Sequence, residues 1–298
     1  MSKTYDDSYD DTAIVCNFRK RYVTGNRNII NRYSVKEFGN IIYEYYQKHG
    51  RDFAWRQTTD PYHILVSEMM LQQTQTDRVA VKFEVFINAF PTAETLAASS
   101  LRDVLMIWQG MGYNRRARHL HEMAVKIIES YDGRIPDTPE ELVRLPGIGK
   151  ATAAAICAFA FNKPVVFVET NIRAVFIHFF FQSRKKVHDQ DILKLVEAML
   201  DRSNPGQWFS ALMDYGAMLK RKHPNPSRKS AHHQKQTSFK GSRRQLRGLV
   251  LRSLLAHRGV TVKRLSIMLN KPQDTVASVI DELVKDRLIT RKGNLLTV

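Results

Sequence analysis

Cysteine is scarce in this chain, since only Cys16 and Cys157 occur among 298 residues. Two cysteines cannot build the disulfide framework of a small secreted domain, nor a cluster held by four thiolates. The sequence also lacks a signal peptide and any run of eighteen apolar residues. These absences predict a soluble intracellular protein of the cytoplasm or nucleoid, with no membrane association.

Acidic residues are missing between Asp214 and Asp274, in a chain whose formal net charge is +17. A run of this kind is compatible with a solvated linker, but it also favours contact with a DNA backbone. The basic side chains crowd its first half: Lys220, Arg221, Lys222, Arg228, Lys229, Lys235, Lys240, Arg243, Arg244 and Arg247.

Two glycines bracket one apolar residue in the stretch 145–150, which reads Leu-Pro-Gly-Ile-Gly-Lys. Gly147 and Gly149 allow a sharp turn just before the helix expected over 151–161, and such a turn points N–H groups outward. A concave group of amides beside a helix N-terminus is a phosphate site. The next acidic residue along the chain is Glu169. This hairpin could therefore hold a DNA backbone while a carboxylate faces the bound nucleotide.

Apolar periodicity is helical almost throughout the stretch 34–222. A capping box is expected at Ser34, before a helix that ends at Gly50. Another is expected at Thr138, with proline at the first helical position. Further helices are expected over 62–73, 78–90, 101–109, 114–131, 151–161, 170–181, 189–200 and 206–220.

The C-terminal residues show the pattern of a small basic domain. Helices are expected over 243–257, 261–269 and 272–287, with a hairpin formed by 288–291 and 294–298. The third helix is expected to bury Val276, Val279, Ile280, Leu283 and Val284. This order resembles a winged helix-turn-helix, whose third helix commonly enters a DNA groove. A winged helix for dimerisation or protein binding is the alternative. The predicted division is a flexible tail over 1–33, a helical domain over 34–222, a basic linker over 223–242 and this domain over 243–298.

Three further segments contain residues suited to DNA chemistry. The stretch 61–74 places Glu68 and Gln72 four residues apart on one helix face. The stretch 51–56 reads Arg-Asp-Phe-Ala-Trp-Arg, and 110–118 reads Gly-Met-Gly-Tyr-Asn-Arg-Arg-Ala-Arg. A glycine-bracketed turn at a helix start can push an apolar and an aromatic side chain into a base stack. The alternatives are an ordinary exposed glutamate, a surface arginine pair beside a core tryptophan, and a core or cap tyrosine.

These four motifs occur in the order found in the helix-hairpin-helix DNA glycosylases, and residues 51 to about 220 resemble the MutY-type adenine glycosylase branch. The resemblance implies that Gln73 fills the gap left by the flipped base and that Met111 and Tyr113 wedge beside the orphan base. It also implies a wider set of DNA contacts: Gln72, Gln73, Thr74, Met111, Tyr113, Arg115, Arg116, Gly147, Gly149 and Lys150.

The same resemblance implies an active site with Glu68 as general acid, Glu169 as stabiliser of the sugar cation and Asn171 as a supporting donor. Breaking an N-glycosidic bond develops positive charge on the sugar and negative charge on the base, which two such carboxyl groups oppose. Related bifunctional enzymes have a lysine nucleophile at the position of Ala151, so base removal without strand cleavage is expected. The base pocket implied by the resemblance comprises Arg51, Trp55, Arg56 and Ser210.

The departures from the family concern both chemistry and substrate. Glu169 replaces the usual aspartate, which moves a positioned carboxylate by roughly a bond length. The family's four cysteines for an iron–sulfur cluster are represented, at approximate spacing, by Lys220, Ser227, Ser230 and Gln236, so no cofactor is expected. Ser210 replaces a longer polar side chain that helps to read adenine. The family's domain that recognises 8-oxoguanine is expected to be replaced by the winged helix.

We therefore expect an all-helical, two-lobed helix-hairpin-helix glycosylase with a C-terminal winged helix. The leading hypothesis is a monomeric, monofunctional enzyme that removes adenine mispaired with guanine or 8-oxoguanine from double-stranded DNA. One rival is a glycosylase for thymine, uracil or another damaged base, which Ser210 favours. The other is a non-catalytic DNA-binding protein that has lost activity through Glu169.

Overall fold

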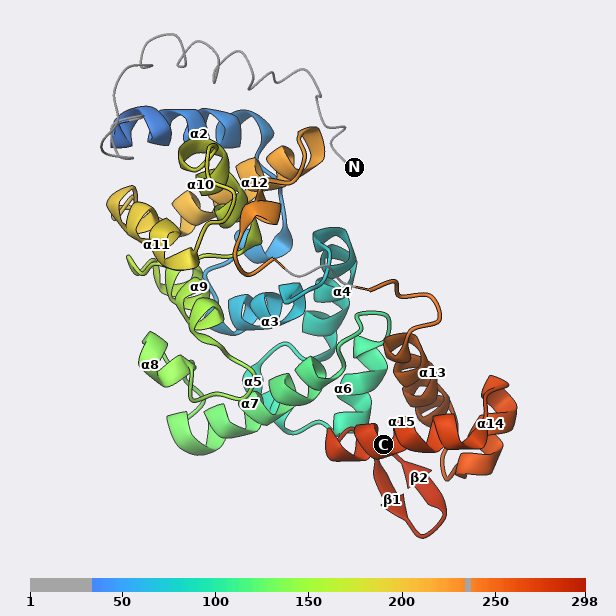
Figure 1. The fold of residues 1–298 in the computed structure, drawn as a ribbon. Coiled ribbons are helices and arrows are strands. Elements are labelled where there is room, and N and C mark those ends of the chain that lie inside the picture. Colours follow the sequence, from blue (N-terminus) through green and yellow to red (C-terminus); the bar gives the residue numbers. More distant parts are fainter. Residues whose placement is uncertain (1–33, 234–236) are drawn as a thin grey trace. The chain divides into compact units, whose positions relative to one another are not determined.

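A computed structural model of the chain describes residues 34–233 and 237–298, and these are mostly helical (Figure 1). The tail expected over 1–33, together with Lys235 and Gln236 of the expected linker, lies outside the described residues. One two-stranded antiparallel sheet occurs within the described ranges. No helix among them is long and apolar enough to cross a membrane.

The chain divides into two compact units, each made of segments distant in sequence. The first unit combines Met1–Asp52 with Cys157–Gln234, and the second combines Phe53–Ile156 with Lys235–Val298. The border falls inside helix α9 (Lys150–Phe161). Contacts thus group the C-terminal residues with the middle of the chain, whereas the sequence suggested a separate domain after the linker.

The first unit is a helical bundle whose core contains packed aromatic side chains. Its N-terminal helix begins with the expected capping box: Ser34 Oγ accepts from the Glu37 amide, and the Glu37 carboxylate accepts from the Ser34 amide. The Phe38 ring centre lies 5.2–5.8 Å from four other ring centres, those of Phe176, Phe179, Phe180 and Trp208. The main helices are α2 (Val35–His49), α10 (Thr170–Phe180), α11 (Asp189–Ala198) and α12 (Pro205–Lys222).

Part of the expected linker is packed on this unit. A short 3-10 helix, η3 (Pro226–Lys229), buries Pro226 and Ser227. Ser227 Oγ donates to the Thr170 carbonyl at 3.0 Å, and Ser230 pairs with Val187 in a parallel bridge. These residues of the predicted basic linker are therefore held by hydroxyl and backbone hydrogen bonds, which their loop-like composition alone did not indicate.

The second unit begins with η2 (Ala54–Arg56) and buries Phe86 and Trp108, whose ring centres are 5.9 Å apart. Asp60 caps α3 by accepting from the Tyr62 and His63 amides. The capping box expected at Thr138 is absent, since its hydroxyl instead donates to the Glu141 carboxylate at 3.0 Å. The remaining helices are α3 (Pro61–Leu71), α4 (Thr76–Ala89), α5 (Ala93–Ala97), α6 (Leu101–Trp108), α7 (Arg115–Tyr131) and α8 (Pro139–Leu142).

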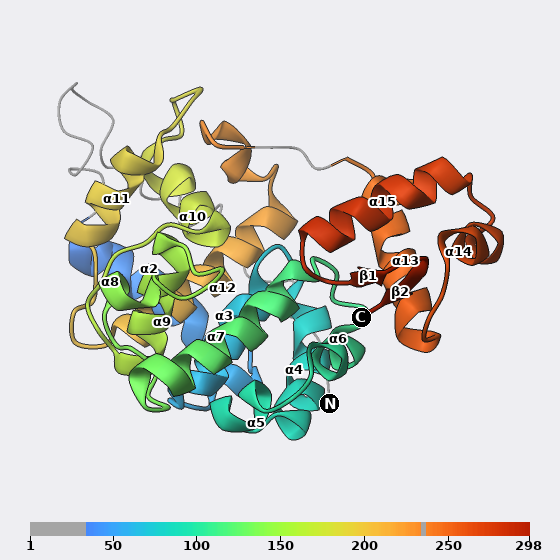
Figure 2. The same cartoon turned by 90° about the horizontal axis from the view of Figure 1, so that it is seen from below.

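Residues 243–298, here called the C-terminal module, form three helices and a hairpin that gather together in both views (Figures 1 and 2). The elements are α13 (Arg243–Ala256), α14 (Val262–Leu269), α15 (Gln273–Lys285), β1 (Thr290–Lys292) and β2 (Leu295–Thr297). Thr290 pairs with Thr297 in the antiparallel register. Val284 was expected in the core but is 37% exposed, because the buried face of α15 is formed by the other four apolar residues. The element order is the expected one, and the assignment as a winged helix stays a prediction.

Candidate nucleic-acid interface and active site

The glycine hairpin lies in the second unit and is shaped for a close approach. Gly147 has φ +79°, and a Cβ there would lie 2.5 Å from His119 Nδ1. Ile148 between the glycines is buried, which anchors the turn, while Gly147, Gly149 and Lys150 are exposed. Helix α9 starts at Lys150, so its first amides have no acceptor within the helix. The hairpin thus presents an exposed helix N-terminus, as a phosphate site requires.

Replacing Gly147 with alanine should disrupt this hairpin. The left-handed φ and the clash with His119 together should destabilise the protein by about 1–3 kcal/mol and weaken duplex binding about tenfold or more. Gly149→Ala is the matched comparison, since its Cβ would meet nothing within 4 Å and thermal stability should hold. Thermal unfolding and fluorescence anisotropy with a labelled duplex at fixed salt measure both effects. Wild-type stability and affinity in Gly147→Ala would contradict this account of the hairpin.

Helix α3 contains Glu68, and its C-cap residue Gln72 contacts the glycine hairpin. Glu68 is half-buried, one turn before Gln72. The Gln72 side-chain amide reaches the Gly147 carbonyl and Thr152 Oγ1, both at 3.3 Å. Gln72 therefore supports the hairpin from within the protein, whereas the sequence suggested that it contacts DNA. Gln73 is exposed and has φ +55°.

Arg116 was expected to contact DNA, but its side chain is buried in the free protein. The guanidinium donates to the carbonyls of Met69 and Met70 at 2.9 and 2.7 Å, at the end of α3. It also donates to Thr74 Oγ1 at 2.8 Å, so Thr74 is engaged inside the protein as well. Burial lowers the pKa of Arg116 to about 10, with Tyr113 opposing the shift, and the group stays charged at neutral pH. Arg116 acts as an internal clamp.

The turn before α7 differs from the expected double wedge. Met111, predicted to insert into DNA, is 1% exposed and packs in the core of the free protein. Tyr113 has φ +48° and is 38% exposed. Arg115, the next predicted contact, has a side chain that is 65% exposed. Tyr113 is the aromatic residue of the 110–113 turn and presents part of its ring to the surface.

Glu169 caps helix α10 in the first unit. Its Oε1 accepts from the amides of Asn171 and Ile172 at 2.7 and 3.1 Å, where a helix N-terminus stabilises negative charge. Asn171 Oδ1 is buried, and within the described ranges no donor reaches it. A Cβ on Gly216 of α12 would lie only 2.3 Å from the Asn171 carbonyl oxygen, so α12 and the start of α10 are in close contact. The carboxylate is thus held by a tightly packed helix start.

Arg51 was predicted to bind the base, but its side chain is used within the first unit. Its guanidinium forms an ion pair with Asp214 at 2.6 Å, and its amide donates to the same carboxylate at 2.7 Å. Asp214 is 2% exposed, and the sequence alone did not identify it as the partner of Arg51. An acidic residue within an apolar helix is nevertheless a signal of a buried ion pair. Burial lowers the pKa of Lys220, while Glu169 raises it and Arg51 lowers it. A cationic side chain therefore lies within electrostatic range of Glu169.

The aromatic part of the predicted base pocket is already packed. Trp55 is 8% exposed and stacks on Phe53 at 4.6 Å with an interplanar angle of 7°. The Arg56 guanidinium lies over the Phe53 ring, with Cζ 5.3 Å from the ring centre. Phe53, half-buried, was not singled out from the sequence, yet it covers one face of the tryptophan that was expected to pack against the base. Ser210 is 6% exposed, which leaves little of it to read a base directly.

Several basic side chains of the run predicted to contact DNA interact instead with acceptors within the protein. Arg243 and Arg247 of α13 form ion pairs with Glu282 of α15. Lys229 donates to the Gln182 carbonyl at 2.7 Å. The charged ends of these three cations are thus engaged by acceptors within the protein.

Comparison with known proteins matches residues 66–198 to the family described as HhH-GPD superfamily base excision DNA repair protein. The adenine DNA glycosylase of Mycolicibacterium smegmatis is 39% identical over 183 residues, 60% of this chain and 61% of that protein. The adenine DNA glycosylase of Mycobacterium tuberculosis is 35% identical over 201 residues, 66% of this chain and 64% of that protein. The chain therefore spans less than two thirds of the length of either relative.

A solved structure of a thermostable thymine-DNA glycosylase superposes with a TM-score of 0.55 at 27% identity, covering 62% of this chain and 86% of that one. The segment matched by the family contains Glu68, the glycine hairpin and Glu169. Sequence match, helical fold and hairpin geometry agree, and residues 66–198 of the chain match the HhH-GPD superfamily of base excision DNA repair proteins.

Proposed function

We propose that this protein is a monofunctional DNA N-glycosylase that removes adenine mispaired with guanine or 8-oxoguanine from double-stranded DNA. The similarity to two adenine DNA glycosylases, at 35% and 39% identity, is the observation that supports this substrate most directly. A single copy is sufficient in this proposal, since one chain contains both carboxyl groups.

Each carboxyl group has a separate role in the proposed mechanism. Glu68, in its protonated form, donates to the adenine ring as negative charge develops on the leaving base. Glu169, ionised at the start of α10, opposes the positive charge that develops on the sugar. The Asn171 amide oxygen is a buried acceptor that no donor among the described residues reaches, so it suits a donor on substrate or water. Water then adds to the sugar, and Ala151 offers no amine for a Schiff base.

DNA contact is proposed for the residues that remain exposed. The amides of the hairpin and Lys150 bind a phosphate, while Gln73 and Tyr113 approach the bases. Arg115 can add a cation at the start of α7. The proposed DNA contacts do not include Met111 and Arg116, because both are buried. Gln72 and Thr74 contribute indirectly, Gln72 by its contact with the glycine hairpin and Thr74 by its contact with Arg116.

A second candidate is a glycosylase for thymine or uracil in mismatches. The superposition on a thymine-DNA glycosylase and the small Ser210 side chain favour it. The test is a single-turnover assay with the full chain on duplexes that contain A:G, A:8-oxoguanine, T:G and U:G pairs, read by nicking with alkali. Alkali-dependent nicking at adenine alone supports the first proposal. Nicking at T:G or U:G supports the second, and no nicking on any duplex leaves the non-catalytic DNA-binding rival.

We also propose that the protein works without an iron–sulfur cluster. Only two cysteines occur in the chain, and Ser227, at one of the approximate cysteine positions, is hydrogen-bonded to a backbone carbonyl. Purified protein should be colourless, with iron well below one equivalent by metal analysis. Stoichiometric iron with visible cluster absorption would overturn this proposal.

A further inference from the structure

The turn 110–113 holds an unusual backbone conformation in front of α7. Gly110 and Gly112 have φ +90° and +70°, and Tyr113 has φ +48°. A tyrosine in the left-handed region is strained and needs outside support. Arg116 supplies part of it, because its guanidinium donates to the Gly112 carbonyl at 3.3 Å and lies 5.4 Å from the Tyr113 ring centre. This support comes from the body of the second unit.

A further support comes from the C-terminal module. Arg244 on α13 donates through Nη1 to the Tyr113 hydroxyl at 3.3 Å. Its other terminal nitrogen donates to the Thr237 carbonyl at 2.7 Å, which fixes the direction of the guanidinium. The tip of the tyrosine is therefore attached to a side chain 131 residues later in the chain.

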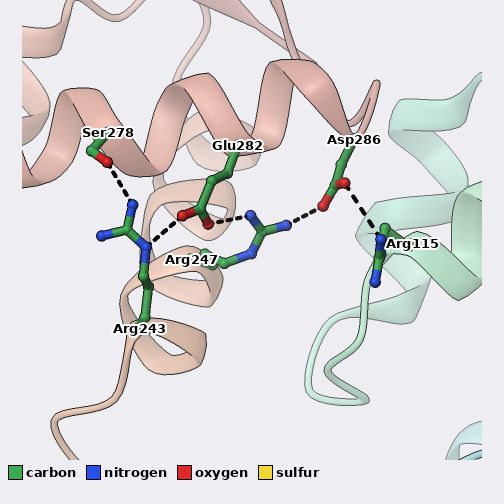
Figure 3. A network of polar contacts seen from close by, with 6 residues as sticks. All are labelled: Arg115, Arg243, Arg247, Ser278, Glu282 and Asp286. Carbon is green, nitrogen blue, oxygen red and sulfur yellow. Dashed lines mark hydrogen bonds and ion pairs between the residues drawn. The ribbon is translucent and has the colours of Figure 1, made fainter.

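Contacts of residues before and after Tyr113 hold the module against the rest of this unit. Arg102 of α6 donates to the carbonyls of Leu254 and Leu255 near the end of α13, the first at 3.3 Å. Arg115 forms an ion pair with Asp286 (Figure 3), and the distance between the charged atoms is 3.7 Å. A cation at the C-terminal end of a helix is favoured by the helix dipole. Helix α13 is thus docked at its C-terminal end as well as through Arg244.

An ionic network orients α13 inside the module. Arg247 pairs with both Glu282 and Asp286, and Arg243 pairs with Glu282 and donates to Ser278 (Figure 3). The acids lie on α15 or directly after it. Asp286 therefore links Arg247 of the module to Arg115 of α7, and the network extends to the residue two positions after Tyr113.

The charge on α15 argues against this helix as the groove reader. Its charged residues are Asp274, Asp281, Glu282 and Lys285, which sum to −2. Phosphates repel such a surface, whereas DNA-reading helices are typically rich in cations. Helix α13 has four arginines and no acid, and it is the helix that touches the Tyr113 turn.

We propose that the C-terminal module is a brace for the 110–113 turn, and that Arg244 is a positioning residue that holds Tyr113 ready for the DNA. The part of this proposal that concerns contact between Tyr113 and DNA rests on the proposed function. The support of the turn by the module is a property of the free protein. With Tyr113 held in advance, less ordering is needed when DNA binds, so the contact favours affinity for the lesion.

The test compares Arg244→Ala with Arg252→Ala, an exposed arginine on the same helix. Amide hydrogen exchange at residues 110–114 is measured on the free full-length protein, with thermal unfolding as the check of folding. Arg244→Ala should speed exchange there roughly two- to tenfold, as expected for one lost hydrogen bond, and Arg252→Ala should not. Arg244→Lys, which keeps a donor, should lie between wild type and Arg244→Ala. Equal exchange in the two alanine variants, or faster exchange spread over the whole second unit, would overturn the brace.

A double-mutant cycle then measures the link to DNA. Tyr113→Phe removes the hydroxyl and keeps the ring, and affinity is measured on a duplex with a tetrahydrofuran abasic analogue opposite guanine. If the two side chains act as one unit, Arg244→Ala with Tyr113→Phe should weaken binding no more than either single change. Additive losses would overturn the proposal, because Arg244 would then contact DNA by itself. Absence of base excision in wild type, with the exchange result intact, would remove the proposed function and leave the brace standing.

Discussion

Replacing Glu68 with glutamine should slow single-turnover adenine excision by about two to four orders of magnitude, the usual contribution of a general acid. Glutamine keeps the size and polarity of the side chain but lacks the transferable proton. Duplex affinity should change little, because the proton is needed in the transition state. Rates are measured with enzyme in excess over an A:8-oxoguanine duplex, and affinity by anisotropy.

The control is Glu84→Gln, an exposed glutamate on α4 of the same unit, which should excise at the wild-type rate. Glu169 provides the companion measurement. Glu169→Gln should also slow excision, because the sugar cation loses its counter-charge. Glu169→Asp restores the family's residue. An excision rate equal to or above that of the wild type would show that glutamate is merely tolerated at this position. A lower excision rate would show that the surrounding residues fit glutamate. Wild-type excision by Glu68→Gln would refute the mechanism whatever the Glu169 variants do.

The local part of the fold was predictable because helices are local structures. The expected helix over 170–181 is observed as Thr170–Phe180, and the expected 243–257 as Arg243–Ala256. Apolar residues at three- and four-residue spacing specify a buried face, and Ser34 has its capping partner three residues away. At Thr138 the same motif does not form a capping box, since the threonine hydroxyl donates to the Glu141 carboxylate.

The site residues were harder, because their partners are far away in sequence. Arg115 and Arg116 are neighbours, but consecutive helical side chains point about 100° apart, so one faces out and the other in. The carbonyls that receive Arg116 lie 46 and 47 residues earlier, and Asp214 lies 163 residues after Arg51. No periodicity reveals such pairs. The sequence therefore located the motifs and left open which polar side chains are used for internal support.

Gly216→Ala should have the second large effect, because this glycine is the contact point between α12 and the start of α10. An added Cβ would lie 2.3 Å from the Asn171 carbonyl oxygen and 2.8 Å from its Cα, which are backbone atoms and cannot rotate away. The start of α10 must therefore move, and with it the amides that hold Glu169. Overpacking of this kind costs about 1–3 kcal/mol of stability.

Displacing a catalytic group by about 1 Å costs on the order of 100-fold in rate, so excision should fall by at least that much in Gly216→Ala. The matched control is Gly39→Ala in α2, where a Cβ meets nothing within 4 Å and alanine should add about 0.5–1 kcal/mol of stability. Thermal unfolding and single-turnover excision are measured on both variants at a temperature where each is folded. A folded Gly216→Ala protein that excises at the wild-type rate would show that the start of α10 does not position the reacting carboxylate, and Glu169 would lose its proposed role.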